Sequence, residues 1–317
     1  MPERSKRIVL SDPEKLEKVC PETLSLMKKY EIDMSLRELS EKTIYQYKKD
    51  LEQWFIYILD NQFNQSVKDL TDDDITEFFY FCKQQGNNTE RMKRRMAAIS
   101  AFYKFLRKKK LILENPCEFL DRPKKGAPIV VQTFLTKEQV QLMKDKLTEY
   151  GDLQLKTYAL FSLSTMARVN AVANVKWKQI DFENRVVKDV LEKEGKIVDL
   201  FFSKEVKELL LQLKAEREEN GIEDFGWVFY SGYNTEDKPI STGTLGEWCK
   251  KIGKMIGVDS WHPHDFRHTQ SQLYSLAGMP LEDISALLNH SGTDVTRKHY
   301  LKTDTRRLTQ LKDELDV

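Results

Sequence analysis

The sequence predicts a mainly α-helical protein with a small β-sheet, divided into two domains. Apolar residues recur at helical spacing over most of the 317 residues. One stretch, residues 186–202, alternates apolar and polar side chains around a short polar turn, as the two strands of a hairpin do. Two prolines and a glycine interrupt the helical pattern at residues 122–133, which places a linker between the domains.

Composition indicates a cytoplasmic protein. The 40% of hydrophobic residues suffices for real cores, and no apolar run is long enough to cross a membrane. No signal peptide is recognisable, and the four cysteines lie far apart without a C-x-x-C pair, which fits a reducing compartment. The net charge of only +1 gives no global sign of nucleic-acid binding, so any such surface must be local.

The sequence predicts a charged N-terminal extension at residues 1–34, with one helix of its own. A compact helical domain is expected after it, at residues 35–122. Three helices are expected in the domain, beginning after Ser40, after the N-cap residue Thr71 and at Thr89. The first turns of the third helix carry four basic residues: Arg91, Lys93, Arg94 and Arg95. Such a run is either a solvated face or a surface that contacts DNA phosphates. The basic linker, residues 123–133, adds Lys124 and Lys125, which could follow a DNA backbone.

The sequence predicts that residues 134–317 form the second domain. The expected elements are, in order, helices at 136–150 and 153–165, strands at 186–191 and 196–202, a helix at 204–220, a strand at 227–230 and a helix at 241–257. The helix at 153–165 is almost wholly apolar on one face, so it should be buried. Arg168 follows it directly. A charged residue next to a buried helix is costly unless it is paired or binds an anion.

All five histidines lie between His262 and Tyr300: His262, His264, His268, His290 and His299. A helix is expected at 265–277 and a second at 281–288, with Gly278 and Pro280 between them. His290 ends the second helix, and short helices at 293–300 and 305–315 should follow. His264 and Arg267 stand three residues apart on one helical face, where an imidazole and a guanidinium suit an anionic ligand.

These motifs together resemble the tyrosine recombinase (phage integrase) family. The resemblance rests on H-D-F-R-H from His264, on L-L-N-H-S around His290, on Tyr300 ten residues later, and on M-A-R-V-N-A-V around Arg168. It implies a helical core-binding (SAM-like) domain at 35–122 and an α+β catalytic domain at 134–317, whose last helix docks on a neighbouring protomer. It also favours the DNA-contacting interpretation of the basic run at Arg91 to Arg95.

The resemblance further implies a catalytic set, namely Arg168, Lys193, His264, Arg267, His290 and Tyr300. Lys193 is assigned only because the family carries a lysine on this hairpin, and Lys196 is the alternative. The chain departs from the family at Ala171, where an acidic residue is common, so whatever orients Arg168 must come from elsewhere.

The implied activity is site-specific DNA recombination. Tyr300 would attack a phosphodiester to form a 3′-phosphotyrosyl bond, while Arg168 and Arg267 hold the phosphate and His290 donates to it. Lys193 would protonate the leaving 5′ oxygen, and His264 would handle the proton of the nucleophile. No cofactor and no metal ion are implied. The expected partner is a double-stranded DNA core site, bound by a homotetramer on synapsed DNA in the nucleoid, with a monomer or weak dimer when free.

Three other functions remain compatible with the sequence. A type IB topoisomerase would use the same chemistry without strand exchange. A metal-dependent hydrolase could use His262, His264 and His268, whose spacing suits metal ligands, although no acidic cluster accompanies them. A DNA-binding protein without catalysis is the third. The biological role, whether integration, dimer resolution or transposition, is not given by the sequence.

Overall fold

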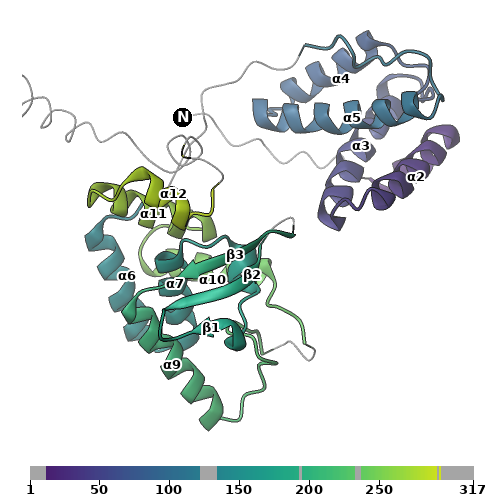
Figure 1. The fold of residues 1–317 in the computed structure, drawn as a ribbon. Coiled ribbons are helices and arrows are strands. Elements are labelled where there is room, and N and C mark those ends of the chain that lie inside the picture. Colours follow the sequence, from purple (N-terminus) through teal and green to yellow (C-terminus); the bar gives the residue numbers. More distant parts are fainter. Residues whose placement is uncertain (1–11, 122–133, 193–194, 233–236, 291–292, 294–317) are drawn as a thin grey trace, which may run out of the picture. The chain divides into compact units, whose positions relative to one another are not determined.

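The chain forms two compact units, residues 1–130 and 131–317, each with its own hydrophobic core. The structure is a computed structural model, and it describes residues 12–121, 134–192, 195–232, 237–290 and 293. Figure 1 shows the helical first unit and the mixed second unit. Of the helices that the structure describes, none combines the length and apolar character that crossing a bilayer requires.

The first unit is all-helical in its described residues. Polar side chains start three of its helices: Ser40 accepts from the amide of Thr43, Asn88 accepts from that of Arg91, and Thr71 forms a capping box. The helices are α1 (Pro13–Glu17), α2 (Pro21–Leu36), α3 (Glu41–Asn61), α4 (Asp72–Gln84) and α5 (Thr89–Lys108).

The segment expected to be a separate N-terminal extension contributes to the core of this unit. Tyr30 and Met34 of α2 are fully buried, and the Tyr30 ring packs against Phe102 and Phe105 of α5. The expected single helix is also divided, because α1 ends at Glu17 and α2 begins at Pro21. The apolar face of α2 therefore folds with α3 and α5 instead of lying outside them.

The second unit combines helices with a three-stranded antiparallel sheet. Its helices are α6 (Lys137–Tyr150), α7 (Leu153–Thr165), α8 (Val169–Ala173), α9 (Lys204–Glu219), α10 (Thr242–Met255), α11 (Pro263–Leu276) and α12 (Leu281–Leu287), with a 3-10 turn η1 (Trp177–Gln179). The strands β1 (Ile180–Asp181), β2 (Val186–Leu191) and β3 (Ile197–Phe201) stand in the order β1-β2-β3. The segment 227–230, expected as a strand, makes only an isolated bridge from Trp227 to Lys176.

Helix α7 lies at the centre of this unit, where α6, α9, α11 and β3 contact it (Figure 1). Its tyrosine Tyr158 and phenylalanine Phe161 are buried, as the apolar pattern predicted. The sheet turns one face to this core through Val187, Val190 and Leu200. The ends of α7, α11, α12 and the β2–β3 hairpin carry the polar groups described next.

Candidate active site

Arg267 is a buried charge in the first half of α11. Only 1% of the residue is exposed. Its Nη1 donates to the carbonyl of Met166 at 2.7 Å. Its Nη2 donates to the carbonyl of Leu288 and lies 2.8 Å from Nε2 of His290. One guanidinium thus ties together the ends of α7 and α12, and these contacts compensate the loss of hydration that burial imposes.

The position of His290 depends on Asn289, which adopts a left-handed backbone conformation after α12. Asn289 has φ of 53°, a conformation that Asn adopts more readily than most residues. The turn brings the amide of His290 to the carbonyl of Ser285 at 3.1 Å. Because a guanidinium only donates, Nε2 of His290 is the acceptor in its contact with Arg267. A neutral His290 ring therefore carries its proton on Nδ1.

Arg168 stands just past the end of α7 and is the N-cap residue of α8. Its side chain is 30% exposed, and its Nη1 donates to Oε2 of Glu192. The carboxyl side of this pair is almost fully buried, with 2% exposed. Ala171 left the partner of Arg168 unassigned in the sequence, and the structure supplies Glu192 at the end of β2.

The β2–β3 hairpin reaches this cluster through Lys196. The amide of Glu192 donates to the carbonyl of Lys196 at 2.7 Å, and Gly195 takes a positive φ of 74° in the turn. Nζ of Lys196 donates to the carbonyl of Asn289, the residue before His290. Lys193, the first choice from the sequence, lies outside the described residues, whereas its alternative Lys196 lies beside the site.

His264 lies in the first turn of α11, one turn before Arg267, and is exposed to solvent. Loss of hydration lowers the pKa of its ring below the usual 6.5. The positive charges of Arg267, His262 and Arg168 act in the same direction, and Asp265 opposes them. The neutral form is therefore favoured near pH 7, and a neutral imidazole can accept a proton.

The other two histidines of the H-x-H-x-x-x-H motif have different neighbours. His262 caps α11, because its backbone amide and its Nδ1 both lie 2.8 Å from Oδ2 of Asp265. The ring of His268 lies edge-on to Phe134 with 6.1 Å between centroids. Within the part of the chain that the structure describes, no group of three or more His, Cys, Asp or Glu side chains could hold a metal ion.

The structure thus places Arg267 in contact with His290, and it links Arg168 to the hairpin that also contacts the His290 loop. Tyr300 lies outside the described residues, as do His299 and the helices expected at 293–300 and 305–315, apart from Thr293 itself. Glu192 is the residue that sequence reasoning missed. Its signal was an acidic side chain at the end of a strand, in a chain that lacks an acid at position 171.

Two of the basic residues expected to contact DNA share a buried carboxylate. Nη2 of Arg91 lies 2.9 Å from Oδ1 of Asp50, and Nε of Arg94 lies 3.0 Å from Oδ2. The Asp50 side chain has no exposed surface, and burial raises its pKa. Arg91 and Arg94 stay 26% and 42% exposed. Both side chains therefore remain partly accessible at the surface of α5.

Arg95 does not fit the expected phosphate contact. The residue is 2% exposed, its Nη2 donates to Gln53, and its guanidinium lies 5.8 Å from the ring centroid of Phe78. Helical geometry explains the difference, because Arg95 follows Arg94 by about 100° and so faces the core of the unit. Lys124 and Lys125 lie outside the described residues.

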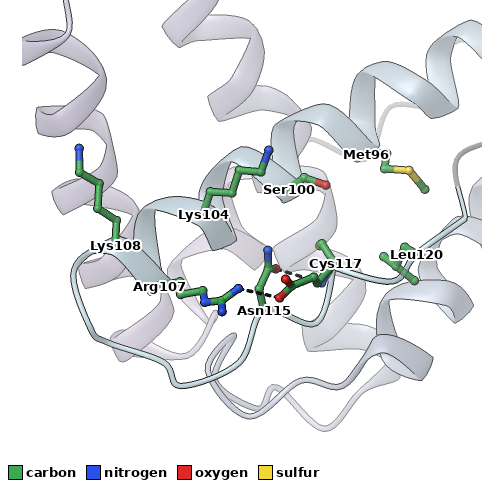
Figure 2. A pocket seen from close by; sticks show the side chains of 9 residues that line it. Met96, Ser100, Lys104, Arg107, Lys108, Asn115, Cys117 and Leu120 are labelled. Carbon is green, nitrogen blue, oxygen red and sulfur yellow. Dashed lines mark hydrogen bonds and ion pairs between the residues drawn. The ribbon is translucent and has the colours of Figure 1, made fainter.

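A second basic region lies farther along α5. Lys104, Arg107 and Lys108 line a hollow of about 460 Å³ between α5 and the segment that follows it. Figure 2 shows these side chains. Arg107 donates to Glu118 across this hollow at 2.6 Å. Lys104 and Lys93 are separated by about three helical turns, so both lie on one face of α5.

Comparison with known proteins identifies the family. The sequence profile of the phage integrase family matches residues 133–307, more than half of the chain. The chain belongs to the phage integrase family. The profile of the SAM-like N-terminal domain of phage integrases matches residues 28–110, within the helical unit. As a member of this family, the chain is a site-specific recombinase with DNA as its partner.

Curated relatives agree with this membership along most of the chain. The tyrosine recombinase XerC of Pediococcus pentosaceus is 25% identical over 283 residues, which cover 87% of this chain and 92% of the relative. The tyrosine recombinase XerD of Halalkalibacterium halodurans is 24% identical over 277 residues, which cover 85% and 90%.

Solved structures share the fold of this integrase-family chain. XerH recombinase bound to a palindromic difH substrate aligns with a TM-score of 0.71 and 17% identity, over 95% of this chain and 86% of that chain. A lambda integrase fragment, a dimer bound to a COC′ core site, aligns with a TM-score of 0.67 and 18% identity, over 87% and 94%.

Proposed function

We propose that this recombinase cuts and rejoins DNA through a 3′-phosphotyrosyl intermediate, with Tyr300 as the nucleophile. The observation that carries the proposal is the contact of Arg267 with His290 on a buried scaffold, beside a hairpin that also holds Arg168. Two guanidinium groups and an imidazole gathered in this way suit a phosphodiester whose negative charge grows in the transition state.

The proposed reaction step is a phosphoryl transfer from DNA to the tyrosine. A bond forms between Oη of Tyr300 and the scissile phosphorus, and the bond from phosphorus to the 5′ oxygen breaks. The tyrosine hydroxyl loses its proton, for which neutral His264 is the proposed acceptor. The departing 5′ oxygen gains a proton from the hairpin lysine, Lys193 or Lys196. The reverse reaction with another 5′-hydroxyl rejoins the strands without an energy source.

The two arginines take complementary parts in this proposal. Arg168 is partly exposed, so its guanidinium can contact a phosphate. Arg267 is buried; it orients His290 and adds positive charge next to that ring. His290 donates to the phosphate from Nδ1. Because the two guanidinium groups supply the positive charge, the proposed reaction uses no metal ion and no cofactor.

DNA binding is proposed for basic residues of the first unit, in addition to the phosphate contacts of the active site. In the helical unit, Arg91, Lys93, Arg94 and Lys104 of α5 provide an accessible basic surface. The linker lysines Lys124 and Lys125 are proposed as further contacts to the DNA backbone. The target is a double-stranded core site in the nucleoid. Four copies of the chain act on two synapsed sites, whereas the free chain is a monomer or a weak dimer.

A nicked suicide substrate tests the nucleophile. The wild-type chain should become covalently attached to DNA, and Tyr300→Phe should bind the same DNA without forming an adduct. Tyr274→Phe is the matched control, because Tyr274 packs against the small core of Met166, Ile284 and Leu288. An adduct formed by the Tyr300→Phe protein would overturn the assignment. Relaxation of supercoils without exchange between two labelled sites would favour the topoisomerase alternative.

A further inference from the structure

Arg168 owes its position to a carboxylate from another element. Its Nη1 donates to Oε2 of Glu192, whose side chain is 2% exposed. Ala171, one helical turn after Arg168, is fully buried and carries no polar group. The acid that accompanies Arg168 therefore comes from the end of β2 instead of from α8.

The backbone around Glu192 is fixed on both sides. Nδ2 of Asn174 donates to the carbonyl of Leu191 at 3.1 Å and to that of Asn170 at 2.9 Å, which fastens the end of β2 to α8. The amide of Glu192 donates to the carbonyl of Lys196 at 2.7 Å and closes the hairpin. The carboxylate thus reaches Arg168 from a rigid base.

Burial of the Glu192 carboxylate favours a close contact with Arg168. A buried carboxylate is costly without a partner, so Glu192 strongly favours conformations in which the guanidinium stays close. Arg168 is itself partly exposed, and a guanidinium has five N–H donors in a fixed plane. With Nη1 directed to Glu192, one edge of the guanidinium is occupied, and the remaining donors can meet a phosphate.

The same hairpin also touches the loop that carries His290. Nζ of Lys196 donates to the carbonyl of Asn289. Glu192 and Lys196, at the two ends of one turn, therefore connect the hairpin to Arg168 on one side and to the His290 loop on the other. Displacement of the hairpin would move Arg168 together with the lysine.

We propose that Glu192 is a positioning residue for the recombination reaction: it holds the Arg168 guanidinium in the orientation that meets the scissile phosphate and replaces the carboxyl absent at Ala171. The proposal rests on the function proposed above. Glu192 itself touches no reacting atom, so its effect passes through Arg168.

The test compares covalent adduct formation on two suicide substrates, one with the natural scissile phosphate and one with a neutral methylphosphonate. Glu192→Gln should slow the reaction on phosphate by about 10²-fold, because a displaced guanidinium no longer meets the oxygens in line. DNA affinity should stay within about twofold, since counterion release depends on charges along the whole duplex. On the methylphosphonate, the difference in rate between Glu192→Gln and the wild type should be smaller, because the neutral group offers less negative charge for Arg168 to bind.

Two further variants keep the test decisive. Glu192→Gln combined with Ala171→Glu returns a carboxyl to the vicinity of Arg168 and should recover part of the rate. Glu192→Asp keeps the charge but withdraws it by one methylene, so it should fold even if the Gln variant fails to, and it should react at an intermediate rate. Glu205→Gln, which breaks the exposed pair with Lys144 at 2.6 Å, should behave as wild type throughout.

The outcomes separate the two proposals. A wild-type rate for folded Glu192→Gln or Glu192→Asp, or an equal loss on both substrates, would overturn the positioning role. A wild-type chain that binds DNA but forms no adduct would instead overturn the proposed function.

Discussion

Nη2 of Arg267 lies 2.8 Å from Nε2 of His290, and the same guanidinium donates to the backbone carbonyls of Met166 and Leu288. These contacts make Arg267 both a structural and a chemical group. Arg168 differs, because its side chain is 30% exposed and it pairs with the carboxylate of Glu192. The two arginines should therefore respond differently to the same substitution.

Arg267→Lys should lower both stability and adduct formation. A lysine cannot reproduce the planar fork, so buried carbonyls lose their donor, at a cost of about 1–3 kcal/mol each. The rate on a suicide substrate should fall by about 10²- to 10³-fold, the effect of losing one oriented donor at a developing charge. Chemical denaturation and single-turnover kinetics measure the two effects.

Arg168→Lys is the companion variant. It should reduce adduct formation to a similar extent while leaving the unfolding midpoint nearer that of the wild type, since Lys retains a charge beside Glu192. Equal destabilisation by the two substitutions would contradict the division of roles.

A separate prediction concerns α5. Lys93 pairs with exposed Glu90 at 2.9 Å, and Lys68 of the same unit pairs with Glu22 at 2.5 Å. Both pairs are surface pairs, so neither contributes much to stability. Lys93→Ala should reduce the slope of log affinity against log salt by about 0.9, the value expected for one lost phosphate contact. Lys68→Ala should leave the slope unchanged.

Arg95→Ala provides the contrast within α5. Because Arg95 is buried against Phe78 and Gln53, its loss should lower the unfolding midpoint without a selective change in the salt slope. If Lys93→Ala and Lys68→Ala gave the same slope, the proposed DNA-contacting face of α5 would have to be moved.

The fold could be predicted well where periodicity and capping agree. Thr136 caps α6 and Thr71 caps α4, as expected, and the hairpin appears where apolar and polar residues alternate. A separate extension was expected because sequence alone does not say that Tyr30 packs on α5 and that Met34 is buried. The strand at 227–230 was wrong because its pairing depends on a distant neighbour, and in the described residues the pairing amounts to an isolated bridge between Trp227 and Lys176.

The site could be predicted residue by residue for groups with a motif, but not for contacts between distant elements. Arg267 and His290 come from one window, and the structure puts them in contact. The pairing of Arg168 with Glu192 depends on how β2 ends beside α8, which no local pattern encodes. Burial of Arg95 likewise depends on which face of α5 meets α3 and α4.

Metal removal gives a further test. The proposed chemistry relies on Arg168 and Arg267 for positive charge and on neutral His290 as a hydrogen-bond donor, so adduct formation should proceed at an undiminished rate in excess EDTA. The measurement is single-turnover cleavage before and after chelation, with a magnesium-dependent nuclease as the positive control. Loss of activity that zinc or magnesium restores would point to the histidine-rich motif as a metal site.

The last prediction follows from the lowered pKa of His264. In the unfolded chain the ring titrates near 6.5, whereas in the folded chain its pKa is lower. Between these two values the unfolded state binds more protons, so stability must fall as pH falls from about 6.5 through the folded pKa and then lose no more from this group. His264→Gln removes that component. Urea unfolding at pH 7.5 and at pH 5.5 should therefore show a smaller pH-dependent change in the variant than in the wild type. The surrounding groups Arg267, His262, Arg168 and Asp265 remain in both proteins, so their contributions largely cancel in the comparison. An equal or larger change in the variant would mean that the folded ring is not held neutral, and His264 would lose its place as the proposed acceptor of the Tyr300 proton.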